Sequence, residues 1–279
     1  MENTLKNYPP EMAWAIIQAK NQSFAIATQD LREMVIMPEV SEVPNTGQYV
    51  RGVINLRGRV LPLIDLRKRI GLASLAEENA AFSAMLDQRE KDHQNWIREL
   101  EASVREKREF RLATDPHKCA FGKWYGTYKP ESTLVAMQLK KFDQPHQQIH
   151  AIAAEVKKLE AQGELDRAHA LIEETRSGTL ARLVALFADL RALVRESSRE
   201  IALIVDDAGK RFAISADSAL SVEKLAAGSI EPLQAGVGVA HGGVVRRFGK
   251  KAKGGEVILI LESDRLRDGA EQLTGGCTE

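Results

Sequence analysis

The chain has 279 residues, and its 39 lysines and arginines balance 39 aspartates and glutamates, so the formal net charge is zero. This length is sufficient for two domains of ordinary size, each with its own hydrophobic core. A neutral chain has no overall field that would attract nucleic acid or an anionic membrane, so we expect specific protein or small-ligand partners.

The cysteines and the most apolar segment indicate in which cellular compartment the protein is expected. The two cysteines, Cys119 and Cys277, do not form the disulfide framework of a small secreted protein. The most apolar segment, Val257–Leu261, is too short to span a bilayer, and the first residues do not have the pattern of a signal peptide. We therefore expect a cytoplasmic protein without direct membrane insertion.

Up to about Gly71 the sequence predicts short β-strands joined by turns. Apolar stretches at Ala13–Ala19, 24–28 and 60–66 are bounded by turn-forming residues. The tetrapeptide Asn55-Leu56-Arg57-Gly58 is typical of a β-hairpin turn.

Residues 76–197 predict an all-helical insert, because glycine and proline become scarce and apolar residues recur every three or four positions. Strands are expected again after Arg199, at residues 201–206, 211–214, 244–248 and 257–261. An even number of helices returns its two ends to the same side, so a bundle can interrupt a β domain without separating its halves. We therefore predict a β module in two parts, 1–75 and 198–279, around a bundle at 76–197.

Histidines in the insert suggest a metal site. His146 and His150 lie four residues apart on a predicted helix and project from one face, although such a pair is often only two surface residues. His93 lies on the apolar stripe of the first helix, and Cys119 lies between these elements. Three imidazoles and one thiolate make a tetrahedral set suited to zinc. The other histidines are His117, which could compete as a ligand, His169 and His241.

Three segments together resemble the chemoreceptor zinc-binding family. They are His93-Gln94-Asn95-Trp96, Cys119-Ala120-Phe121-Gly122-Lys123-Trp124 and His146-Gln147-Gln148-Ile149-His150. The resemblance implies zinc as cofactor, held by His93, Cys119, His146 and His150. A zinc thiolate also makes Cys119 the candidate redox-sensitive residue, ahead of Cys277.

Two other interpretations of the insert remain open. In the first, Trp96 and Trp124 stack in an ordinary core and the histidines only donate or accept hydrogen bonds. In the second, the protein is a zinc hydrolase, which needs a glutamate general base after the first histidine of the pair. Gln147 occupies that position and cannot take a proton. The sequence also has no P-loop and no dinucleotide fingerprint, so we expect no enzyme activity and no catalytic residues.

The β module resembles the CheW-like coupling family. The resemblance lies in Tyr49-Val50-Arg51-Gly52-Val53-Ile54-Asn55-Leu56-Arg57-Gly58-Arg59-Val60-Leu61-Pro62-Leu63-Ile64-Asp65-Leu66 and continues through segments 201–207, 230–232 and 257–266. Residues 236–253 depart from the usual family spacing. The family resemblance implies a pair of small β-barrels that link chemoreceptor cytoplasmic tips to a chemotaxis histidine kinase.

The same resemblance implies three partner-binding residues. Leu31 and Glu33 match a partner-contacting strand, and Arg57 matches an arginine that is linked to receptor coupling. The alternatives are an ordinary core residue for Leu31 and a solvated surface charge for Glu33. Arg57 offers a planar donor fork to a partner carboxylate.

The expected fold class is α+β multidomain, with a CheW-like pair of small β-barrels split by an antiparallel four-helix-type zinc-binding bundle. The expected function is a chemotaxis adaptor whose bundle senses zinc or an oxidant. The alternative is a constitutive scaffold in which zinc is purely structural. We also consider a homodimer formed through the bundle.

Overall fold

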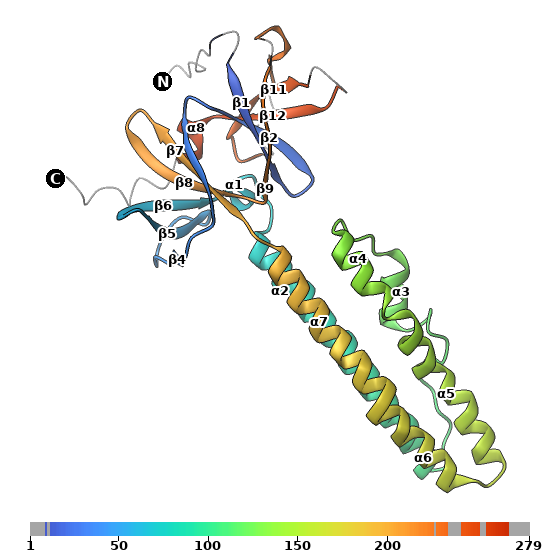
Figure 1. Ribbon diagram of the computed structural model, residues 1–279. Helices are drawn as coiled ribbons and strands as arrows, with labels where there is room; N and C mark the ends of the chain where they lie inside the picture. Colours follow the sequence, from blue (N-terminus) through green and yellow to red (C-terminus); the bar gives the residue numbers. More distant parts are fainter. Residues whose placement is uncertain (1–8, 10–11, 226, 234–240, 252–254, 268–279) are drawn as a thin grey trace. The chain divides into compact units, whose positions relative to one another are not determined.

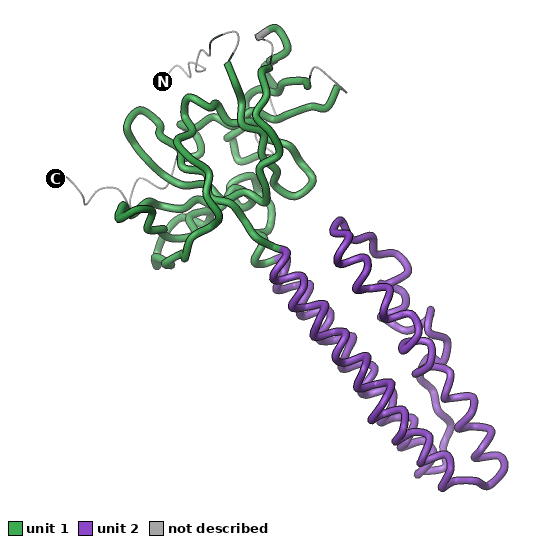
Figure 2. The backbone as a smooth tube through the Cα atoms, viewed as in Figure 1, with its two compact units in different colours: residues 1–77, 198–279 green, residues 78–197 purple. Residues whose placement is uncertain are grey.

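The chain divides into two compact units, one made of Met1–Glu77 with Ser198–Glu279 and the other of Glu78–Ser197 (Figure 2). The computed structural model describes residues 9, 12–225, 227–233, 241–251 and 255–267. The first unit consists mainly of β-strands, and the second is helical (Figure 1). In these described ranges no helix has both the length and the apolar character needed to cross a membrane.

The first unit contains two six-stranded sheets. The order in one sheet is β10 (Glu231–Pro232), β11 (Val245–Lys250), β12 (Val257–Leu261), β2 (Gln22–Ala27), β1 (Ala13–Ala19) and β9 (Ser218–Lys224). The order in the other is β3 (Leu31–Ile36), β7 (Ile201–Asp207), β8 (Lys210–Ala216), β6 (Arg59–Asp65), β5 (Val50–Leu56) and β4 (Val40–Ser41). Short helices α1 (Leu66–Arg69), η2 (Ala227–Ser229) and α8 (Ser263–Arg267) complete the unit.

Each sheet is assembled from both halves of the split module. In the first sheet β1 pairs with β9 and β2 pairs in parallel with β12. In the second sheet β3 pairs with β7 and β6 pairs in parallel with β8. Their shared core includes Phe24 and Ile64 from the first half and Leu203 and Phe212 from the second. The predicted fold class is confirmed, and its two barrels correspond to these two sheets.

The expected hairpin turn joins β5 to β6. Leu56 pairs with Arg59, so the loop consists of Arg57 and Gly58, with φ angles of 52° and 81°. Two positive φ angles in a two-residue loop match the twist of the flanking strands. The Asn55 side chain also accepts a hydrogen bond of 3.0 Å from the Gly58 N–H, which fixes the turn.

The strand that we expected at residues 60–66 ends earlier, at Asp65. Leu66 instead begins helix α1, because the Asp65 side chain accepts a hydrogen bond from the Lys68 N–H and caps that helix. An N-cap residue has extended backbone angles, so Asp65 can be both the last residue of β6 and the N-cap of α1.

The helical unit contains α2 (Leu75–Arg105), α3 (Ala120–Thr127), α4 (Thr133–Lys140), α5 (Asp143–Ala161), α6 (Leu165–Thr175), the π-helical turn η1 (Arg176–Leu180) and α7 (Ala181–Ser197). Helices α2 and α7 run side by side (Figure 1). Arg191 joins them through ion pairs of 2.8 Å to Asp87 and 2.9 Å to Glu90. Arg176, in η1 just before α7, pairs with Glu101 near the C-terminal end of α2. The two helices are therefore antiparallel.

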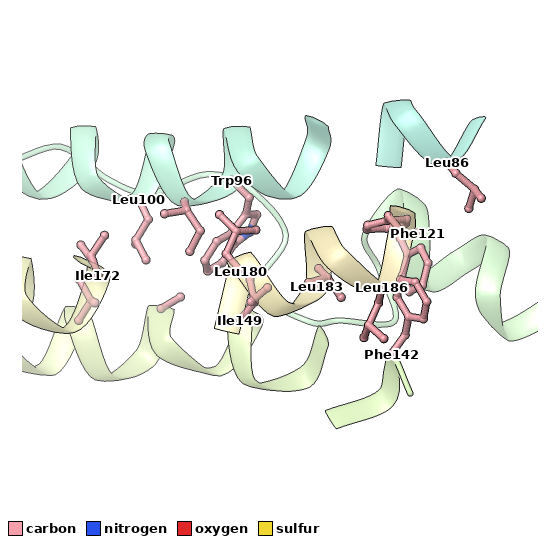
Figure 3. Close-up of a cluster of buried hydrophobic side chains, with 14 of the residues drawn as sticks. Leu86, Trp96, Leu100, Phe121, Phe142, Ile149, Ile172, Leu180, Leu183 and Leu186 are labelled. Atoms are coloured by element: carbon pink, nitrogen blue, oxygen red, sulfur yellow. The ribbon is translucent and has the colours of Figure 1, made fainter. Parts of the chain in front are cut away.

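The core of the bundle follows the apolar stripes that the sequence predicts. Buried residues on α2 include Leu86, Trp96 and Leu100, and they belong to one cluster with Ile149 of α5 and Leu183 of α7 (Figure 3). Burying each such side chain stabilises the fold by about 1.5–3 kcal/mol. This core is separate from that of the β unit, so each unit has its own source of stability.

Both chain segments that lead to the bundle are fastened within the β unit. Ser74 and Glu77 cap the start of α2 reciprocally, with bonds of 2.8 Å and 3.1 Å between side chains and backbone N–H groups. Lys68 also pairs with Glu77 at 2.8 Å. After α7, Glu200 forms an ion pair with Arg51 of β5.

Candidate metal centre

His93 is buried on α2, and one of its two ring nitrogens has no hydrogen-bond partner among the described residues. Its Nδ1 lies 2.6 Å from the Arg89 carbonyl oxygen. A carbonyl only accepts, so Nδ1 carries the proton and Nε2 keeps a bare lone pair. That Nε2 is buried and makes no hydrogen bond within the described part of the chain.

His150 on α5 has the same arrangement. Its Nδ1 donates to the Ala113 carbonyl at 3.0 Å, and its buried Nε2 has no hydrogen-bond partner among the described residues. His146 lies one turn earlier on α5, with its ring centroid 4.9 Å from that of His150. Two neighbouring imidazoles therefore project from one face of the helix, as their spacing predicts.

Cys119 is the N-cap residue of α3 and brings a sulfur atom to the same place. Its Sγ accepts a hydrogen bond of 3.1 Å from the Gly122 N–H and lies 3.2 Å from His146 Nε2. Burial raises the pKa of the Cys119 thiol, and the backbone N–H groups of Gly122 and Phe121 oppose that shift. The cap therefore holds the sulfur close to the His146 imidazole.

The structure brings together all four residues singled out in the sequence. Each of His93, Cys119, His146 and His150 offers one ligand atom, and these atoms lie within 4.8 Å of one another. A tetrahedral zinc site needs ligand atoms about 3.3–3.8 Å apart, so a small inward movement would complete it. The bare nitrogens of His93 and His150 fit such an ion, because metal-binding histidines donate their other N–H to a backbone carbonyl.

The three imidazoles have the protonation state that metal binding requires. Burial lowers the pKa of His146 to about 3 and the pKa of His150 to about 4, and the nearby His93 adds to both shifts. Burial also lowers the pKa of His93. Neutral imidazole is the form that ligates a metal, so all three are ready to bind at neutral pH.

Aromatic rings pack against the histidines of the cluster. The Phe121 ring lies 4.9 Å from the His146 ring and 5.4 Å from the Phe187 ring. The Trp96 ring lies 5.1 Å from the His150 ring. A cavity of about 430 Å³ borders the cluster, and His93, Cys119 and His150 are among its lining residues. One side of the site is therefore open to small molecules.

The remaining histidines lie outside the cluster. His117 is exposed even though it is close to Cys119 in sequence, and His169 of α6 and His241 of the β unit are half-buried. Gln147, the residue at the hydrolase base position, is exposed on α5. Cys277 lies outside the described residues.

The expected partner-binding residues of the β unit lie on and beside β3. Leu31 is half-buried and packs against the main core. Glu33 forms an ion pair of 2.8 Å with Arg57, whose side chain is 79% exposed. These two charges border a depression of about 390 Å³ that also contains Arg32, Arg59 and Arg211. This gathering of arginines has no signature in the sequence, because it depends on the pairing of β3, β7, β8 and β6.

Models of two protein families match consecutive parts of the chain. The CheW-like domain matches residues 14–92, and the chemoreceptor zinc-binding domain matches residues 93–157, which contain all four residues of the cluster. The chain joins a CheW-like domain to a chemoreceptor zinc-binding domain. Zinc is therefore the cofactor of the insert, and the histidine and cysteine cluster is able to hold a metal ion.

Several chemotaxis proteins are similar to part of the chain. The chemotaxis protein CheW of Bacillus subtilis is 37% identical over 57 residues, which are 20% of this chain and 36% of that protein. CheW of Helicobacter pylori is 44% identical over 52 residues, 19% of this chain and 32% of that protein. The probable chemotaxis protein CheW of Rhizobium etli is 40% identical over 52 residues, 19% and 34% of the two chains. The similarity thus spans about a third of each relative's length.

One solved structure is similar to the chain in outline. The crystal structure of the scaffolding protein TtCheW from Thermoanaerobacter tengcongensis gives a TM-score of 0.42 at 13% sequence identity. The superposition covers 90% of this chain and 89% of that chain. The family model of the CheW-like domain ends at residue 92, and the strands after residue 198 complete the same two sheets.

Proposed function

We propose that the chain is a non-enzymatic chemotaxis adaptor that couples the cytoplasmic tips of chemoreceptors to a histidine kinase. The CheW-like domain and the similarity to chemotaxis proteins support this assignment. The exposed Arg57 beside an arginine-lined depression suits a partner that presents carboxylates. The cytoplasm is the proposed compartment, because these partners meet there.

The helical insert, with a proposed extent of residues 76–197, is the sensing part of this adaptor. The observation that carries the proposal is the convergence of four ligand atoms, two of them buried nitrogens that lack any hydrogen bond among the described residues. We assign His93, Cys119, His146 and His150 as the zinc ligands. They come from α2, α3 and α5, so a change at the site alters how three helices are held together.

The proposed stimulus is an oxidant, with the zinc level as the other candidate signal. Zinc, when bound, keeps the Cys119 sulfur deprotonated at neutral pH. A two-electron oxidant such as a peroxide would transfer one oxygen atom to this sulfur, which becomes a sulfenic acid, while the peroxide is reduced to an alcohol or water. Sulfenic acid is a weaker ligand than thiolate, so the Cys119 segment would be released from α5.

A purely structural zinc site is the alternative function. It is favoured by the burial of all three imidazoles, since a closed set of four protein ligands holds its metal tightly. A measurement of zinc affinity distinguishes a sensor of the zinc level from a structural zinc site. A sensor of zinc is partly empty at cellular zinc concentrations, whereas a structural site stays filled.

Graded oxidation tests the redox proposal. Treating the zinc-loaded full-length protein with oxidant should modify Cys119 before Cys277, release zinc and change the activity of the receptor-coupled kinase. Mass spectrometry locates the modified sulfur, and a chromogenic chelator follows the released zinc. Cys277→Ser should respond like the wild type, and Cys119→Ser should not respond. Modification of Cys277 first, or zinc release without a change in kinase activity, would favour the structural alternative.

A further inference from the structure

Residues 106–119, here called the strap, connect α2 to α3 and pass beside the metal centre. The carbonyl oxygen of Ala113 in the strap accepts two hydrogen bonds. One comes from the Trp96 indole Nε1 at 2.8 Å, and the other comes from His150 Nδ1 at 3.0 Å. A carbonyl oxygen has two lone pairs, so it can accept both bonds fully. One oxygen therefore joins α2, α5 and the strap.

The position of this oxygen decides the orientation of His150. The Nδ1–H bond to Ala113 keeps the proton on Nδ1 and directs Nε2 into the cluster. Trp96 also supports the imidazole directly, with ring centroids 5.1 Å apart in an edge-to-face contact. Trp96 is only 4% exposed, so its indole is fixed in place by the core of the bundle.

Two cavities border the strap around Ala113. A cavity of about 430 Å³ borders Leu112 and Ala113, and a second cavity of about 570 Å³ borders Phe110, Leu112 and Thr114. The Phe110 ring packs edge-to-face on Trp96, with centroids 5.0 Å apart. Trp96 therefore holds the strap by one ring contact and one hydrogen bond, only a few residues before Cys119.

We propose that Trp96 is a positioning residue for the metal centre and acts through the Ala113 carbonyl that its indole N–H shares with His150. It fixes the carbonyl that holds the His150 tautomer, and it fixes the strap that delivers Cys119. The inference rests on the proposed ligand assignment. Its specific claim is that the indole N–H contributes to zinc binding beyond the aromatic ring itself.

The test compares zinc affinity in full-length Trp96→Phe with that in the wild type, by competition with a chelator. Phenylalanine keeps an aromatic ring but removes the N–H donor, so affinity should fall about 10-fold, the lower end of effects at outer-sphere partners. Trp124→Phe is the matched control, because the Trp124 ring packs on Phe82, Phe121 and Tyr128 rather than on a histidine of the cluster. Its affinity should stay within about twofold of the wild type.

Two further measurements separate positioning from simple packing. Replacing Trp96 by 3-benzothienylalanine keeps the shape of the ring system and substitutes sulfur for the N–H, so the bundle keeps its core. In both Trp96 variants the His150 Nδ1 proton, observed by ¹H–¹⁵N NMR, should exchange with water faster than in the wild type. Unchanged affinity and unchanged exchange in the benzothienyl variant would overturn the proposal for Trp96.

The ligand assignment is checked in the same experiment. His150→Ala should lose most zinc affinity, and if it does not, the ligand assignment fails and the role of Trp96 falls with it. If His150→Ala loses zinc while the benzothienyl variant binds like the wild type, the ligand assignment stands and only the positioning role is wrong. The two failures are therefore distinguishable.

Discussion

Gly122 lies in the first turn of α3, where the backbone leading to Cys119 passes directly over it. A Cβ atom at this position would lie 1.8 Å from the Pro116 carbonyl oxygen, so any side chain must displace the segment before Cys119. We expect Gly122→Ala to weaken zinc binding about 10-fold or more, because the Gly122 N–H also holds the Cys119 sulfur. Unfolding of the zinc-free protein should become easier by about 1–3 kcal/mol.

Gly126 provides the control for this substitution. It lies in the same helix, and a Cβ atom there meets nothing within 4 Å. Gly126→Ala should leave zinc affinity unchanged in a chelator competition and should stabilise the helix slightly. Equal zinc affinity in the two variants would show that the Pro116 carbonyl does not constrain Cys119.

Removing a ligand should affect zinc binding far more than removing a neighbouring histidine. His93→Ala, Cys119→Ala, His146→Ala and His150→Ala should each lower zinc affinity by roughly 100-fold or more, beyond the usual effect of an outer-sphere change. His117→Ala and His169→Ala should bind one zinc per chain like the wild type. Metal analysis of the six purified variants decides the matter, and loss of zinc from the His117 variant would contradict the assignment.

The sequence predicts the side chains that act as ligands better than the backbone groups that orient them. His146 and His150 are recognisable because helical spacing alone brings them to one face. The carbonyl groups of Arg89 and Ala113, which orient two of the imidazoles, have no side-chain signature. Ala113 in particular lies in a segment without regular structure, so only the folded chain identifies it as an acceptor.

At the scale of single elements, the β5–β6 hairpin presents Arg57 at its tip. Arg57→Glu places a negative charge next to Glu33 and removes a donor fork from the surface. We expect weaker binding to receptor and kinase in a pull-down. The stability of the fold should change by less than about 1 kcal/mol, because exposed ion pairs contribute little. Thermal unfolding checks the second expectation.

A charge swap provides the control for this element. The double variant Glu33→Arg with Arg57→Glu restores an ion pair of opposite polarity across the hairpin and β3. If partners need a cation at the tip of the hairpin, the swap will not restore binding. Full recovery of binding would mean that the intramolecular pair matters and that Arg57 itself makes no partner contact.

Some elements have clear sequence patterns and others do not. Strand β12 matches its expected bounds because its apolar residues follow one another without interruption. Strand β9 was not predicted, since Leu220 and Val222 are 47% and 59% exposed and the strand lacks a buried apolar face. The π-helical turn Arg176–Leu180 was also missed, because the apolar stripe continues through it from α6 to α7.

At the scale of the whole molecule, the two halves of the β module should fold together without the bundle. Replacing residues 78–197 by a short flexible linker removes one compact unit and leaves the strand pairs of both sheets intact. We expect the shortened protein to unfold cooperatively and to bind receptor and kinase in a pull-down. Circular dichroism checks the fold, and the full-length protein is the reference for binding.

The contrary outcomes are informative at this scale. A shortened protein that folds but binds neither partner would place the partner contact in the bundle. A shortened protein that aggregates would show that the two halves need the bundle to find each other.

The change from strand-like to helix-like sequence predicts two kinds of unit, but strand register across the insert follows only from the fold.

The interleaving of the two halves also sets an order of events during synthesis. Strands β2, β3 and β6 emerge from the ribosome before β12, β7 and β8, their partners from the second half, and residues 78–197 must be made in between. At about 5–20 residues per second this delay lasts roughly 6–24 s. During that time the antiparallel pairing of α2 with α7 returns the chain to where it left the first half. Strands β7 and β8 therefore begin their search for β3 and β6 close to the first half, although residues 78–197 separate the two halves in sequence.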